Sequence, residues 1–168
     1  LVFLLAVPYV IPIVLDEYWV NITAELMIWS LFAASVNLLF GYTGLLSFGQ
    51  ALYFGMGAYG VAFGLEYLDM SFWPAFLTGM VLGTAFAVVA GLLAVRLTWH
   101  YFAIITVVFS LIFYFMAVGT KELTGGDDGM PLSIPPVLKV GSFELTLFNQ
   151  TFQYYFIMAT VGLGFYLM

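Results

Sequence analysis

The chain has 168 residues, of which 64% are hydrophobic and 7% are charged, and its mean hydropathy is +1.12. Ordinary soluble domains are about 45–50% apolar and about 25% charged, so this composition indicates an integral membrane protein. The net charge of −6 argues against binding to nucleic acid, which requires clustered basic side chains, and the absence of cysteine excludes a disulfide or a thiolate metal site within the chain.

The first residues read as the end of a membrane helix. Residues 1–15 are mostly apolar and contain Pro8 and Pro12, so we predict a first helix that is kinked by its prolines. The chain starts and stops inside apolar runs, and we therefore expect it to be part of a longer protein. Residues 16–19 form a polar and aromatic break typical of a membrane interface, and a second span is predicted over Ile22 to Phe40.

The apolar stretch from Asn37 to Gly64 is heavily broken by glycine. Each interior glycine costs a soluble helix about 1 kcal/mol relative to alanine. In a membrane, glycines allow helices to approach closely, or they permit non-helical turns where the chain lines a cavity. We predict a third crossing, or a broken re-entrant one, that closes at Glu66 and Asp69. The glycines are Gly41, Gly44, Gly49, Gly55, Gly57, Gly60 and Gly64.

Three further spans are predicted, over Phe72 to Leu97, Tyr101 to Thr120 and Phe152 to Met168. The first of these repeats a small residue at every fourth position, which puts a smooth ridge along one helix face. We interpret the ridge as a surface for close helix packing rather than as part of a transport path. Its members are Ala75, Gly79, Gly83, Ala87 and Gly91.

A long polar segment, residues 121–150, separates the last two spans. It contains the sequence T-G-G-D-D-G at 124–129, in which two carboxylates lie among glycines. These residues could bind a cation or contact a partner protein. Glycine and aspartate are also the residues that form turns, and we favour the turn. Residues 143–148 roughly alternate between polar and apolar, which favours a short strand.

The charges are consistent with this order of crossings. If the start of the chain faces the cytoplasm and each apolar segment crosses once, all nine carboxylates fall on the outer side. Arg96 and His100 then fall on the inner side, while Lys121 and Lys139 lie outside. We therefore expect an orientation with residues 121–150 outside the cell.

The sequence offers little for catalysis. No carboxylate lies at mid-membrane depth in this arrangement, which argues against a proton relay or a cation-coupled carrier. His100 is the one histidine, and no metal-ligand spacing, nucleophile motif or nucleotide-binding glycine motif occurs. We expect a protein that is not an enzyme.

Uncharged polar residues gather among the glycines instead. Hydrogen bonds between helices explain any one of them. Together they favour a path for a small polar or zwitterionic solute, formed where the backbone of a helix is broken. They are Asn37, Tyr42, Thr43, Ser47, Gln50 and Tyr53.

Three ordered motifs resemble one family. G-Y-T-G-L-L-S-F-G-Q at 41–50 with G-M-G-A-Y at 55–59, H-Y-F-A-I-I-T at 100–106 and L-T-G-G-D-D-G-M at 123–130 are similar to the permease subunits of branched-chain amino-acid ABC importers, specifically the second of two homologous permeases. Many relatives carry Glu or Gln and then Arg after the position of Thr106, whereas this chain has Ser110, Leu111 and Tyr114.

This resemblance implies an all-α, polytopic permease bundle in a prokaryotic inner membrane, with residues 1–168 as one incomplete transmembrane domain. The implied partners are a homologous permease, two cytoplasmic ATPase subunits that bind the ATP and Mg²⁺, an extracytoplasmic solute-binding protein and the lipid bilayer. The chain itself would hold no cofactor, and the segment that couples to the ATPases would follow Met168.

The resemblance also singles out residues for the two candidate regions. Candidates for the translocation path are Asn37, Gly41, Tyr42, Thr43, Gly44, Ser47, Gly49, Gln50, Tyr101 and Thr106. Candidates in the extracytoplasmic loop are Thr124, Gly125, Gly126, Asp127, Asp128 and Gly129. The expected substrate is a branched-chain or similar small amino acid. The alternatives are urea or a short amide, or a channel-like subunit without ATPase coupling.

Overall fold

A computed structural model of the chain describes residues 8, 18–94, 96, 99–140, 143–147 and 149–168. The chain forms two compact units, one made of residues 1–38 and 136–168 and the other of residues 39–135. The prediction of a first helix over residues 1–15 concerns residues that, except for Pro8, lie outside the described part.

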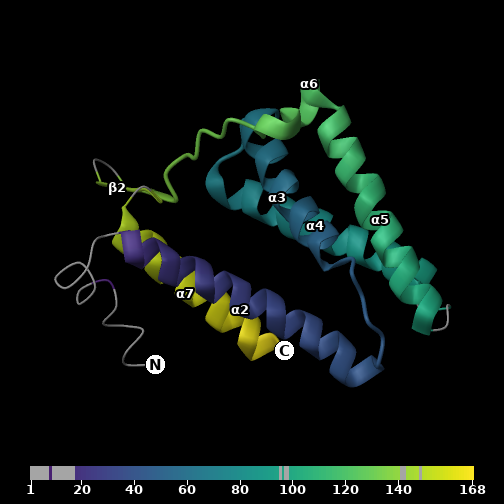
Figure 1. Cartoon of the computed structure of the whole chain (residues 1–168). Helices are drawn as coiled ribbons and strands as arrows, with labels where there is room; N and C mark the ends of the chain where they lie inside the picture. The colour runs from purple at the N-terminus through teal and green to yellow at the C-terminus, as the bar shows by residue number, and fades with distance from the viewer. Residues whose placement is uncertain (1–7, 9–17, 95, 97–98, 141–142, 148) are drawn as a thin grey trace. The chain divides into compact units, whose positions relative to one another are not determined.

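The first unit is built on two long helices, α2 (Tyr18–Thr43), whose residues to position 38 belong here, and α7 (Gln150–Leu167). They lie side by side and begin at the same end of the unit (Figure 1). Their contact forms a core in which Tyr154 is fully buried. The other core members are Val20, Ala24, Met27 and Val161.

The start of α7 is fixed by Asn149. The Asn149 side chain accepts hydrogen bonds from the backbone N–H groups of Thr151 at 3.1 Å and of Phe152 at 3.4 Å, which satisfies two of the free donors at a helix N-terminus. Before this cap, the strands β1 (Leu138–Val140) and β2 (Phe143–Leu145) pair antiparallel. The predicted strand over 143–148 is thus confirmed for its first three residues.

The second unit contains α3 (Gln50–Glu66), α4 (Phe72–Ala94) and α5 (Trp99–Gly119), followed by α6 (Lys121–Thr124) and the 3-10 helix η1 (Gly126–Asp128). Figure 1 shows α3 crossing α4, with α6 and η1 near the end of α3.

The closest contact in this unit joins α3 to α4 through small residues. A Cβ atom built on Gly60 would lie 2.8 Å from the Cα atom of Gly79, and one built on Gly64 would lie 3.1 Å from the Cα atom of Ala75. Gly83 approaches the backbone of Gly57 in the same antiparallel order. The packing interpretation is therefore confirmed for three members of the α4 ridge, whereas a Cβ on Gly91 would meet nothing within 4 Å.

Three of the described helices are long and apolar enough to cross a membrane: residues Tyr18–Thr43, Phe72–Leu93 and His100–Gly119. α3 has 17 residues, so its axis measures about 26 Å, somewhat less than the roughly 30 Å of the hydrocarbon core. Apart from the small hairpin, the regular structure of the described residues is helical, which confirms the predicted all-α class.

Candidate functional site

The glycine-rich stretch contains a break between two helices. α2 runs on to Thr43, three residues beyond the predicted end of the second span, and α3 begins at Gln50. Gly44 ends α2 with a φ of +67°, and its N–H donates to the carbonyl of Phe40 at 2.9 Å. This left-handed conformation is typical of glycine just after a helix and lets the chain leave the helix axis. Residues 44–49 form the connection, which we call the α2–α3 break.

Two hydroxyl groups of α5 hold the backbone of this break. The N–H of Phe48 donates to Oγ1 of Thr106 at 3.2 Å, and Oγ of Ser110 donates to the carbonyl of Phe48 at 3.3 Å. Both backbone polar groups of one non-helical residue, Phe48, are thereby satisfied by residues about 60 positions later in the chain. We call Phe48, Thr106 and Ser110 the Phe48 clasp.

The hydrogen positions of the clasp can be assigned from its partners. Thr106 Oγ1 donates to the carbonyl of Ala103 at 2.9 Å, so it is free to accept from Phe48 through a lone pair. Ser110 has one hydroxyl hydrogen and two acceptors, the carbonyls of Phe48 and of Thr106, the latter at 3.0 Å. The Ser110 contact to the break is therefore shared with a bond inside α5, and Thr106, which is 1% exposed, holds the break more firmly.

Ser47 and Gly49 fit the break against α5. The N–H of Gly49 donates to Oγ of Ser47 at 3.2 Å, and both residues are buried. A Cβ atom on Gly49 would lie 3.3 Å from Cβ of Thr106, tighter than an ordinary contact. Absence of a side chain at Gly49 thus lets the backbone reach the threonine hydroxyl.

The break lies well inside the span formed by α5. Thr106 and Ser110 follow Trp99 by seven and eleven positions, which places them about 10 and 17 Å along the helix axis. Non-helical backbone at membrane depth is tolerated where it is buried in protein or lines a water-filled cavity. The Phe48 clasp meets this condition, because side chains of α5 bond to the backbone N–H and carbonyl of Phe48.

The structure brings together some of the predicted path residues and separates others. Ser47, Gly49 and Thr106 lie in contact around the clasp, and Gln50 begins α3. The Thr43 hydroxyl donates to the carbonyl of Leu39 at 2.6 Å and accepts from the N–H of Leu45 at 3.2 Å, so it supports the end of α2. The remaining candidates are exposed: Gly41 and Tyr42 on α2, Gly44 directly after it, Tyr101 on α5 and, in the first unit, Asn37.

Ser110 was missed in the choice of path residues, whereas Tyr53 was named in the polar cluster. Ser110 follows Thr106 by four positions, and this spacing puts both hydroxyls on one face of α5. That spacing was the available signal. Tyr53 also lies near the break, because its hydroxyl is 3.4 Å from the Cβ position of Gly49.

The loop of residues 124–129 has the geometry of a series of turns. Gly125 has a φ of +75°, and a Cβ atom there would lie 2.1 Å from the carbonyl oxygen of Gly129. The Thr124 hydroxyl donates to the carbonyls of Ala117 and of Thr120, and it accepts from the N–H of Gly126 at 3.3 Å. This supports the turn interpretation, although it leaves the exposed side chains of Asp127 and Asp128 available.

Helix α6, which leads into this loop, is tied to the end of α3. The hydroxyl of Tyr67 donates to the carbonyls of Glu122 and Leu123, each at 3.1 Å. α3 and α5 therefore run in the same direction, with the clasp near the start of α3 and the loop at its end. Within the described residues, no group of three or more His, Cys, Asp or Glu side chains could hold a metal ion.

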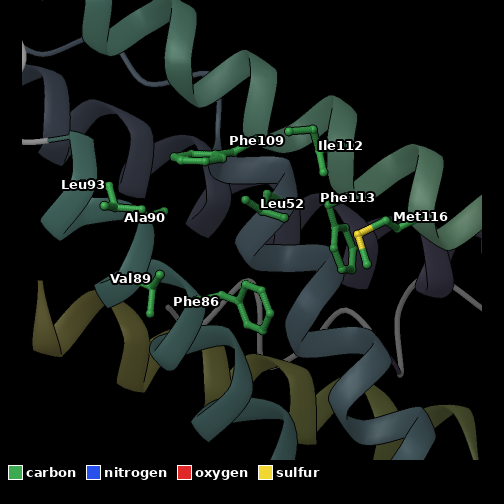
Figure 2. A pocket seen from close by; sticks show the side chains of 9 residues that line it. All are labelled: Leu52, Phe86, Val89, Ala90, Leu93, Phe109, Ile112, Phe113 and Met116. Atoms are coloured by element: carbon green, nitrogen blue, oxygen red, sulfur yellow. The ribbon is translucent and has the colours of Figure 1, made fainter.

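A separate cavity of about 190 Å³ lies between α3, α4 and α5 (Figure 2). Its nine lining side chains carry neither oxygen nor nitrogen, so they offer no hydrogen bond to a polar solute. We do not assign it to the candidate path. They are Leu52, Phe86, Val89, Ala90, Leu93, Phe109, Ile112, Phe113 and Met116.

Comparison with known proteins adds independent findings. The profile of a family described as branched-chain amino acid transport system / permease component matches residues 18–168. The chain is 28% identical over 138 residues to the high-affinity branched-chain amino acid transport system permease protein LivM of Escherichia coli (strain K12), an alignment that covers 82% of this chain and 32% of that protein. LivM of Salmonella typhimurium is 28% identical over 135 residues, which cover 80% of this chain and 32% of the relative. The chain thus spans about a third of the length of these curated relatives, and no solved structure matches it.

Proposed function

The chain belongs to the family of branched-chain amino acid transport system permease components, and from this premise we propose that it is part of the permease subunit of an ATP-driven importer. In this proposal it forms half of a translocation path for branched-chain or similar small amino acids. It acts as a transport subunit and not as an enzyme, within a single transmembrane domain of a multi-pass inner-membrane protein.

The observation that carries the proposal is the α2–α3 break held by the Phe48 clasp. An uninterrupted helix offers a solute only side chains, because its backbone groups bond to one another. A break at depth supplies backbone groups and small polar side chains close to the path, as at the discontinuous helices of transporters. Ser47 and Gly49, predicted as path residues, lie at this break.

The helix directions support the predicted order of crossings. An alternating order requires α2 and α7 to run in one direction, and it requires α3 and α5 to run together and opposite to α4. Within the first unit α2 and α7 are parallel (Figure 1). Within the second unit α3 is antiparallel to α4 and parallel to α5.

In the proposed assembly this subunit pairs with a homologous permease, with two cytoplasmic ATPase subunits and with an extracytoplasmic solute-binding protein. ATP and Mg²⁺ bind to the ATPases, and this chain holds no cofactor. Hydrolysis in the partners would switch the permease pair between outward-open and inward-open forms.

The test is uptake by the complete transporter. The full-length subunit is reconstituted with these partners in proteoliposomes, and uptake of labelled leucine and of labelled urea is measured with ATP and with a non-hydrolysable analogue. We expect leucine uptake that requires hydrolysis. Uptake of urea without leucine would move the assignment to the urea and amide permeases, and flux that is independent of ATP would support a channel-like subunit.

A further inference from the structure

A second cavity, of about 440 Å³, extends between α3, α5 and the start of η1. Its size falls in the range of about 300–1,000 Å³ that is typical of sites for small molecules. Ser110 of the Phe48 clasp lines it, and so does Asp127 of the loop that follows α5. The cavity thus connects the two regions that the sequence singled out separately.

The lining combines apolar walls with a few polar groups. Leu52 and Phe113 supply aliphatic and aromatic surface, and both also line the apolar cavity of Figure 2. Tyr59 and Tyr114 bring two aromatic rings with hydroxyl groups. The ring of Tyr59 packs edge-on against Phe113 with centroids 6.1 Å apart, which fixes one wall of the cavity.

The charge on the described residues that line this cavity is negative. Among the described residues that line it, Asp127 carries the charge, since the other lining residues are apolar, glycine, serine or tyrosine. Lys121 lies beside Gly126 on the same loop but does not line the cavity. A carboxylate favours a cationic group by ion pairing, and tyrosine rings in the same lining favour it by cation–π attraction.

We propose that this α3–α5 cavity is a binding site for the transported solute, in which Asp127 pairs with the primary ammonium group of a small aliphatic amino acid and the apolar wall takes its side chain. The proposal rests on the transport function proposed above and assigns a binding site to its solute. It favours an amino acid over urea, which has no ammonium group to pair with the carboxylate.

Two variants of the full-length subunit test the site in the reconstituted transporter. Asp127→Asn removes the charge and keeps the shape. Gly55→Leu fills the cavity from α3, where a Cβ atom has room because its nearest neighbour is 3.8 Å away on Phe113. We expect Asp127→Asn to lower the rate of ATP-driven leucine uptake about tenfold, the scale of a lost charge-assisted hydrogen bond. We expect Gly55→Leu to lower it by at least as much, because the added side chain occupies the space of the solute.

Two matched control variants test whether the loss of uptake is specific to residues that line the cavity. Glu66→Gln removes an exposed carboxylate at the end of α3 that does not line the cavity, and Gly91→Leu adds the same bulk on α4 where nothing lies within 4 Å. We expect both to keep uptake within twofold of the unmodified transporter. The ATPase activity of every variant reports whether the complex has assembled.

The outcomes separate the two proposals. Reduced uptake in both cavity variants with normal controls supports the site. Normal uptake by Asp127→Asn and Gly55→Leu overturns the site and leaves the transport function standing. Absence of ATP-driven leucine uptake in the unmodified transporter overturns the proposed function, and the site with it.

Discussion

Oγ1 of Thr106 accepts a hydrogen bond at 3.2 Å from the backbone N–H of Phe48, which precedes it by 58 positions. Through this bond α5, a helix long and apolar enough to cross a membrane, holds a non-helical peptide unit next to its first half. The bond explains why the chain can leave α2 at Gly44 and begin α3 six residues later without abandoning a buried N–H group.

Replacement of Thr106 by valine tests this role. Thr106→Val keeps the shape of a side chain that is 1% exposed and removes the acceptor. We expect a loss of about 1–3 kcal/mol in stability, the cost of an unsatisfied buried donor, and a lower midpoint of thermal unfolding in detergent. Thr106→Ser should keep most of the stability because its hydroxyl oxygen can still accept the hydrogen bond from Phe48.

A threonine without such a long-range bond provides the control. The Thr160 hydroxyl donates to carbonyls of its own helix, α7, so Thr160→Val removes a bond that the helix does not need. Its unfolding midpoint should stay near that of the unmodified protein. Equal shifts for the two valine variants would show that the Phe48 clasp has no special part in stability.

The contact between α3 and α4 predicts opposite effects for two glycines on the same helix. A Cβ on Gly79 would lie 2.6 Å from the carbonyl oxygen of Gly57, so Gly79→Ala must push the helices apart and should cost about 1–3 kcal/mol. Gly91→Ala meets nothing within 4 Å and should be neutral or stabilising by up to about 1 kcal/mol. Thermal unfolding of both variants in one detergent measures the difference, and a Gly79→Ala variant as stable as Gly91→Ala would refute the close approach.

The loop after α5 offers a second matched pair. Gly125 and Gly129 both have positive φ, +75° and +72°, the first with a ψ of −4° in the left-handed helical region and the second with a ψ of 175° in a region used almost only by glycine, so alanine at either position costs about 1–3 kcal/mol in backbone strain. At Gly125 the added Cβ would also collide with Gly129 at 2.1 Å, whereas at Gly129 it meets nothing within 4 Å. We expect Gly125→Ala to expose the loop to protease far more than Gly129→Ala. Equal cleavage rates would contradict the described turn.

These results show which parts of the fold follow from composition alone. The spans predicted over 72–97 and 101–120 appear as α4 and α5 with ends shifted by at most three residues, because long apolar runs between polar residues have few alternatives in a membrane. The beginning of α3 could not be placed in the same way. Its glycines are poor helix formers, and the contact with α4 that favours a helix there lies at long range.

Part of the candidate site was also predictable from the sequence. Ser47 and Gly49 were selected because glycine and small polar residues adjoin there, and Thr106 because residues 100–106 resemble a family motif. The structure places the three in contact. Ser110 follows Thr106 by four positions on α5, but this spacing does not reveal that its partner is a backbone carbonyl 62 positions earlier, and it was missed. The position of Asp127 beside Tyr59 and Tyr114 likewise depends on the parallel course of α3 and α5.

From the sequence alone, leucine at Gly41, Gly44 or Gly49 should abolish uptake while leaving membrane insertion intact. The space around each glycine in the structure ranks the three variants by their expected loss of uptake. Gly49→Leu should abolish uptake because its Cβ approaches Thr106 at 3.3 Å, while Gly41→Leu meets nothing within 4 Å and should reduce uptake least. Uptake by proteoliposomes measures the order, and normal uptake in the Gly49 variant would mean that the break does not need its close contact with α5.

The central claim, that the α2–α3 break lines the solute route, is tested most directly by thiol labelling. The chain has no cysteine, so single cysteines can be placed at Phe48, whose backbone forms the clasp, and at Val89, which lines the apolar cavity. Their side chains are exposed to the same extent in this structure, 55% and 57%. In the assembled transporter we predict that a membrane-impermeant, water-soluble thiol reagent modifies the Phe48→Cys variant and leaves Val89→Cys unmodified. Equal resistance of both variants to the reagent would contradict the claim.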